Sequence, residues 1–173
     1  MTRVRRALIV AILGSAAVTA CQKHEANVAL VPTEIDPQTT CSLDGMLLAD
    51  YPGPKGQIRY AGEAKPVYFC DTVELFHALL QPEQVKTVEA VFVQDMGKAD
   101  WDNPRGHWID ARKAFYVHGS KRKGSMGPTI AAFAEQSDAA KFVATYGGKV
   151  LGYGEVRPEM ADLSGGALHD TRM

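Results

Sequence analysis

Cysteine and histidine are scarce in this chain of 173 residues, which holds three cysteines and five histidines. No two cysteines form a Cys-x-x-Cys pair, and no two histidines have the His-x3-His spacing. Zinc ribbons and thioredoxin-like proteins depend on such pairs, so neither class has support. A Ser/His/Asp arrangement, a phosphate-binding loop and paired carboxylates are also lacking. We therefore do not expect an enzyme.

An excess of charge of one sign is lacking as well. The chain has 19 basic and 20 acidic residues and a formal net charge of −1 at pH 7. Nucleic-acid binding normally needs a basic surface, so no nucleic-acid partner is expected.

Long apolar runs are lacking except for one near the start, from Ala7 to Val18. This run is too short to cross a hydrocarbon core about 30 Å thick, and it follows three arginines and precedes Thr-Ala-Cys21. The pattern is typical of a bacterial lipoprotein signal. We expect residues 1–20 to be removed and Cys21 to carry the lipid that anchors the protein to a membrane of the periplasm. Gln22, rather than aspartate, favours the outer membrane over the inner one.

The rest of the chain predicts an α+β fold made of two tandem homologous ββαβ modules. Polar residues 21–40, with two prolines, predict a flexible tether. The expected domains are a first module at 41–94, a connecting loop at 95–113, a second module at 114–157 and a flexible tail at 158–173. Within the modules, helices are expected at 72–80 and 138–146, and strands at 57–60, 67–70, 88–93, 114–118, 129–133 and 149–156.

Soft potential metal ligands lie at turns. Cys41 and Met46 flank Gly45, whose freedom at positive φ lets the backbone fold back so that both sulfurs face one point. Met126 lies between glycines in Gly-Ser-Met-Gly-Pro. A thiolate with thioethers selects Cu(I), whereas Zn(II) prefers imidazole and carboxylate. We therefore expect Cu(I) at Cys41, Met46 and Met126, with Met96 and His118 as weaker candidates.

Five short stretches, taken together, resemble one known family: Cys41-Ser-Leu-Asp-Gly-Met46, Gly53-Pro-Lys-Gly56, Gln94-Asp-Met-Gly97, the loop from Trp101 to Trp108, and Met126-Gly-Pro128. The family is the NosL lipoproteins, accessory proteins of nitrous oxide reductase, and the resemblance spans about residues 41–157.

This resemblance implies a periplasmic Cu(I)-binding chaperone that delivers copper for the copper-sulfide centre of nitrous oxide reductase. It also implies two partners for the chaperone, namely nitrous oxide reductase and an upstream copper donor. It also implies a fold of two homologous modules similar to organomercurial lyase. Many relatives carry Cys-x-x-Cys-Gly-Met, whereas Asp44 stands here in place of their second cysteine. This departure leaves Cys41 and Met46 as the matching pair.

Two alternatives stay open at this point. Cys41 and Cys70 are two thiols in a compartment where disulfides persist, so one bridge between them would give a structural scaffold lipoprotein without metal. A thiol enzyme related to organomercurial lyase would need a second activated group near Cys41. Cys70 itself is interpreted as a buried small apolar residue at the end of a strand.

Overall fold

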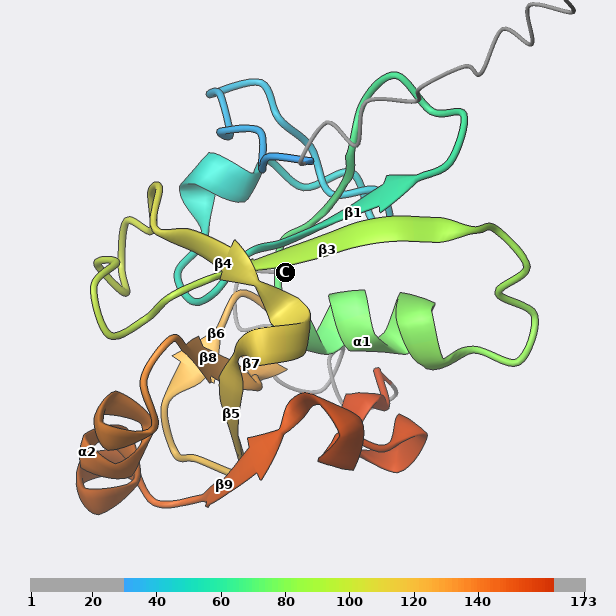
Figure 1. Ribbon diagram of the computed structural model, residues 1–173. Helices are drawn as coiled ribbons and strands as arrows, with labels where there is room; N and C mark the ends of the chain where they lie inside the picture. The colour runs from blue at the N-terminus through green and yellow to red at the C-terminus, as the bar shows by residue number, and fades with distance from the viewer. Residues whose placement is uncertain (1–29, 164–173) are drawn as a thin grey trace, which may run out of the picture.

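The computed structural model describes residues 30–163, and in this part the chain forms two antiparallel sheets, a small hairpin and two α-helices (Figure 1). The expected signal at 1–20, the lipidation site Cys21 and the end of the tail lie outside the described residues.

The first sheet has the strand order β2-β1-β3-β4, and all its neighbouring strands are antiparallel. Its strands are β1 (Gly56–Tyr60), β2 (Val67–Phe69), β3 (Val88–Gln94) and β4 (Trp108–Asp110). Helix α1 (Thr72–Leu80) lies between β2 and β3 in the chain, and Asp71 caps it by accepting a hydrogen bond from the Val73 amide. A ββαβ order is thus present in the first sheet unit, close to the expected bounds.

The second sheet has the strand order β8-β5-β9 and is antiparallel throughout. Its strands are β5 (Phe115–His118), β8 (Ala131–Phe133) and β9 (Lys149–Gly152), with helix α2 (Gln136–Tyr146) before β9. In both sheets the first strand is central and the strand after the helix pairs on its other side. The second unit also contains a hairpin of β6 (Lys123–Gly124) and β7 (Gly127–Pro128), which sequence patterns did not predict.

One of the hydrophobic clusters joins the two units. Leu75 and Phe76 of α1 pack in one buried cluster with Val91 of the first sheet and with Tyr116 and Leu151 of the second. Phe76 meets the Tyr116 ring edge-on, with centroids 4.9 Å apart. Figure 1 shows α1 between β3 and the segment that follows β9, so the first unit's helix is covered from both sides.

Three expected features differ in the structure: the content of the connecting loop, the start of the second helix and the end of the last strand. The connecting loop 95–113 contains β4 and a 3-10 helix, Ala111–Lys113, both too short to give a periodic pattern. Helix α2 begins two residues before the expected Asp138, with Glu135 as its N-cap, and β9 ends at Gly152 rather than Val156.

The described parts of the expected tether and tail also contact the folded body, whereas the sequence predicted flexible segments. Ile35 is buried, and the Thr33 amide and carbonyl form 2.9 Å hydrogen bonds with the Gln57 side chain. Pro158–Ala161 forms a 3-10 helix whose Ala161 is buried, and the Ala161 carbonyl lies 3.0 Å from His77 Nδ1 on α1. Apolar side chains at Ile35 and Ala161 hold both segments against the body.

Candidate metal centre

Cys41 begins a tight turn that ends at Met46. The Cys41 amide donates to the Met46 carbonyl at 2.8 Å, and the Gly45 amide donates to the Cys41 carbonyl at 3.0 Å. Gly45 has φ +80°, the left-handed conformation that glycine adopts without steric cost. The turn thus folds back as the sequence predicts, and it also brings Asp44, which accepts from the Met46 amide at 2.9 Å, to the same side.

Cys70 lies between β2 and α1, where the strand gives way to the helix. Glu74, one turn into α1, points back toward the helix start, and its Oε2 accepts a 3.1 Å hydrogen bond from the Cys70 amide. Glu74 therefore binds the residue that precedes the helix cap, Asp71. This local geometry aims the Glu74 carboxyl at the Cys70 sulfur.

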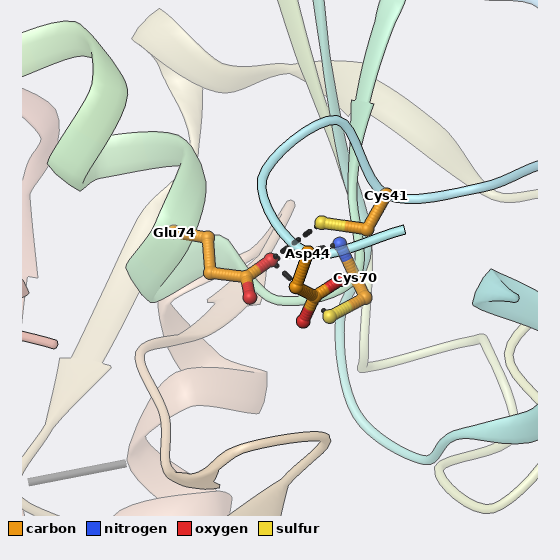
Figure 2. A group of neighbouring side chains, drawn as sticks. All are labelled: Cys41, Asp44, Cys70 and Glu74. Atoms are coloured by element: carbon orange, nitrogen blue, oxygen red, sulfur yellow. Dashed lines mark hydrogen bonds between the residues drawn. The ribbon is translucent and has the colours of Figure 1, made fainter. Parts of the chain in front are cut away.

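The two segments bring four potential donors together (Figure 2). The Sγ atoms of Cys41 and Cys70 each lie 3.2 Å from Glu74 Oε2. One ligand atom from each of these three residues and from Asp44 all fall within 4.8 Å of one another. Among the described residues, this is the one group of three or more histidine, cysteine or acidic side chains with such a geometry. Two thiols and two carboxyls in this space are sufficient donors for a metal ion.

Burial and mutual contact set the protonation of the cluster. The hydrogen bond from Cys70 lowers the pKa of Cys41 to about 6, against desolvation, while the same contact and burial raise the pKa of Cys70. Burial, with the nearby Cys41 charge, raises the pKa of Glu74 to about 8. These shifts favour the thiolate at Cys41 over a thiolate at Cys70, and they favour the protonated form of Glu74. A thiolate is the form of cysteine that binds metals.

Two further buried charges lie next to the cluster. The Lys55 ammonium donates 2.9 Å hydrogen bonds to the Pro52 and Cys70 carbonyls, and burial lowers its pKa to about 8. Asp71 is fully buried, and desolvation raises the pKa of its carboxyl to about 6. The charge of Asp71 raises the pKa of Lys55, and the charge of Lys55 lowers the pKa of Asp71. Each charge therefore offsets part of the pKa shift that burial causes in the other group.

Two of the expected thioethers lie near the thiols. Met46 and Met126 are half-buried and pack against the buried cluster that contains Cys41 and Cys70. The two weaker candidates lie elsewhere: Met96 packs against the separate cluster around Trp101 and Phe142, and His118 is on β5, paired with Lys149. Of the five candidates, Cys41, Met46 and Met126 therefore belong to one packed group of residues.

Sequence reasoning missed Cys70 and Glu74 as members of the site. Cys70 is buried as expected, but it faces polar atoms rather than only apolar ones: its Sγ lies near Glu74 and 3.4 Å from Ser125 Oγ. The signal was the Cys-Asp-x-x-Glu stretch at 70–74, where an acidic residue one turn into a helix can reach the residue before the cap. The resemblance places Asp44 where a second cysteine was expected, and here Cys70 supplies a second thiol from another segment.

Cys41 and Cys70 are both free in this structure, so the expected alternative of a disulfide-stabilised scaffold is not the state described. The two sulfurs are also covered by the turn above them. Cys41 is 3% exposed and Cys70 0%, while Leu43 and Asp44 on the turn above them are exposed.

The fold and the site define a small, mainly antiparallel α+β protein with a buried dithiol and carboxyl cluster of the kind that binds soft metal ions. The sequence model of the NosL family matches residues 32–161. The chain therefore belongs to the NosL family, as the sequence motifs indicated.

Characterised relatives agree with this assignment. The chain is 37% identical to the copper-binding lipoprotein NosL of Stutzerimonas stutzeri over 97% of its length and 90% of the relative's. It is 38% identical to the copper-binding lipoprotein NosL of Achromobacter cycloclastes over 92% and 83% of the two chains. The crystal structure of the copper chaperone NosL from Shewanella denitrificans matches with a TM-score of 0.72 and 40% identity, covering 75% of this chain and 97% of that one.

These relatives are named as copper-binding lipoproteins and a copper chaperone, not as enzymes. The expectation that the protein is not an enzyme is therefore confirmed. No helix within residues 30–163 is long and apolar enough to span a membrane.

Proposed function

We propose that this protein is a Cu(I)-binding chaperone, and the observation that carries the proposal is the convergence of Cys41 and Cys70 on Glu74 beside two thioethers. Cu(I) is a soft ion that is satisfied by two or three sulfur ligands. The copper-binding names of the relatives support the same cargo.

The proposed ligands are the thiolates of Cys41 and Cys70, with Met46 and Met126 as thioether donors. The lowered pKa of Cys41 favours its thiolate, whereas Cys70, whose pKa is raised, must lose its proton when copper binds. Thioethers carry no proton, so Met46 and Met126 can bind copper without competing with protons.

Copper enters and leaves, in this proposal, past the exposed turn of Leu43 and Asp44, because the sulfurs beneath it are covered. A partner's donors then need contact only with this turn. The partners we propose are nitrous oxide reductase, for its copper-sulfide centre, and an upstream copper donor.

The anchoring is proposed from the sequence. Residues 1–20 act as a lipoprotein signal, and Cys21 carries a lipid that holds the protein at the periplasmic face of a membrane, the outer one rather than the inner one. The tether is then shorter than residues 21–40, since Thr33 and Ile35 already contact the body. We also propose that the two sheet units are tandem homologous ββαβ modules, because both follow the same strand order.

Competition with a chromophoric Cu(I) chelator tests the site. Cys41→Ser and Cys70→Ser variants of the mature protein are expected to lose tight binding, while Cys21→Ser, the same change outside the site, keeps wild-type affinity. Wild-type affinity in Cys41→Ser would place the copper elsewhere.

Nitrous oxide consumption tests delivery. In a strain lacking the native gene and grown with limiting copper, a Cys21→Ser copy behind a cleavable signal is expected to restore part of the consumption, and a Cys41→Ser copy none. Equal consumption with no copy, the soluble copy and the Cys41→Ser copy would rule out copper delivery.

Zinc is a second candidate cargo, because two thiols with Asp44 and Glu74 form a four-donor set that Zn(II) accepts. The thioethers beside the thiols favour copper, since Zn(II) has little affinity for them. We expect Cu(I) to displace Zn(II) from the mature protein at equal concentration, and Met46→Leu to weaken Cu(I) binding only. Retention of zinc under these conditions would favour a zinc site.

A further inference from the structure

The β6–β7 hairpin of the second unit is bound to the start of α1 in the first unit. Ser125 at its tip donates a 2.8 Å hydrogen bond from Oγ to the Cys70 carbonyl, and the same oxygen lies 3.4 Å from Cys70 Sγ. Met126, the next residue, packs against the Cys41 and Cys70 cluster. The place of this tip thus decides where one hydroxyl and one thioether lie relative to the thiols.

The Asp71 carboxylate divides its two oxygens between two tasks. Oδ1 caps α1, accepting from the Val73 amide at 2.9 Å, and also accepts from Thr129 Oγ1 at 2.6 Å. Oδ2 instead faces the hairpin tip, accepting from the Ser125 amide at 3.2 Å and from Ser125 Oγ at 3.4 Å. Capping the helix requires only the first oxygen. The second oxygen serves the hairpin.

Gly124 permits this close approach. A Cβ at Gly124 would lie 2.1 Å from Asp71 Oδ2 and 2.9 Å from Thr129 Cβ, so any larger residue forces the hairpin away from the carboxylate. On the hairpin's other side, a Cβ at Gly53 would lie 2.7 Å from Gly124 Cα. The hairpin is therefore held between Asp71 and the Gly53 backbone.

We propose that Asp71 is a positioning residue for copper: its Oδ2 fixes the β6–β7 hairpin so that Ser125 and Met126 lie beside the thiol pair. This inference rests on the proposed function, because it assumes that the thiol pair binds Cu(I). Asp71 itself touches no metal in this arrangement. It acts through Met126, in the way that residues behind metal ligands orient them.

Asp71→Asn separates the two tasks of the carboxylate. Asparagine is as good an N-cap as aspartate, so its oxygen keeps the bonds to Val73 and Thr129. Its amide nitrogen, however, takes the place of Oδ2 and is a hydrogen-bond donor. It cannot accept the hydrogen bond from the Ser125 amide, so that bond is lost. We expect Cu(I) affinity to fall about 10-fold to 100-fold, the usual loss when a residue behind a metal ligand is changed. Asp110→Asn, the same change at the cap of the 3-10 helix Ala111–Lys113, is expected to keep wild-type affinity.

A double-mutant cycle with Met126→Leu tests whether Asp71 acts through Met126 or only supports the fold. It compares the Cu(I) affinities of the two single variants and the double variant. If Asp71 acts through Met126, the Asp71→Asn/Met126→Leu double variant binds Cu(I) no more weakly than Met126→Leu alone. Wild-type affinity in Asp71→Asn, or losses that add in the double variant, would overturn the inference. Failure of the wild-type protein to bind Cu(I) would instead overturn the proposed function.

Gly124→Ala provides a second test that keeps the Asp71 charge opposite Lys55. It displaces the hairpin sterically, so the same loss of Cu(I) affinity and the same lack of additivity with Met126→Leu are expected. If Asp71→Asn does not fold, this variant decides the matter, and wild-type Cu(I) affinity in folded Gly124→Ala would overturn the inference.

Discussion

Glu74→Gln should change how the stability of the metal-free, reduced protein depends on pH. Burial raises the pKa of Glu74 from 4.5 to about 8, so the folded state holds the proton that the unfolded chain gives up above pH 4.5. The folded state binds more protons within this window, and stability therefore falls as the pH rises from about 4.5 to about 8. Glutamine stays neutral at every pH and keeps one donor and one acceptor, as the protonated carboxyl does.

The size of the effect follows from the same shift. One pKa unit corresponds to about 1.4 kcal/mol, so between pH 4.5 and pH 7 the wild-type protein loses on the order of 3 kcal/mol that the variant does not lose. Glu74 is 1% exposed, so little solvent screening reduces this figure. The free energy of unfolding of Glu74→Gln minus that of wild type is thus expected to rise by that amount between pH 4.5 and pH 7.

Urea unfolding of reduced apo protein at several pH values measures the effect, through the free energy of unfolding extrapolated to water. Glu83→Gln is the matched control, since Glu83 is exposed and should follow the wild-type profile. Parallel pH profiles for wild type and Glu74→Gln would refute the account of a protonated, buried Glu74.

Two other predictions concern the core and the two weaker candidate ligands. Phe76→Ala should lower the free energy of unfolding by about 3–5 kcal/mol, because the ring fills the core shared by both units, and denaturant unfolding measures this. Met96→Leu and His118→Ala should leave Cu(I) affinity in a chelator competition unchanged, since neither residue lies in the thiol cluster; a tenfold loss in either would place a ligand outside it.

Much of the fold could be predicted because its longer elements carry strong local signals. The expected helix at 72–80 has the bounds of α1, and the expected strands at 57–60 and 88–93 match β1 and β3 to within one residue. The hairpin of β6 and β7 and the strand β4 were missed because two or three residues give no period. Their pairing depends on contacts with distant segments, as between the hairpin and Asp71.

The site was predictable where its donors are neighbours in sequence. Cys41, Gly45 and Met46 form one turn, and the glycine at positive φ made their convergence foreseeable. Cys70 comes from another segment, and only the packing of α1 against the Cys41 turn shows that the two thiols meet at Glu74. The resemblance to NosL proteins named the cargo, but Asp44 at the position of a second cysteine pointed away from a two-thiol site.

X-ray absorption at the copper edge of Cu(I)-loaded mature protein tests the central claim most directly, because it reports the type and number of atoms bound to the metal. We expect the copper to be bound by sulfur atoms alone, with one sulfur fewer in Cys70→Ser. A shell dominated by nitrogen or oxygen, or an unchanged spectrum in Cys70→Ser, would contradict the claim that Cys41 and Cys70 hold the copper together.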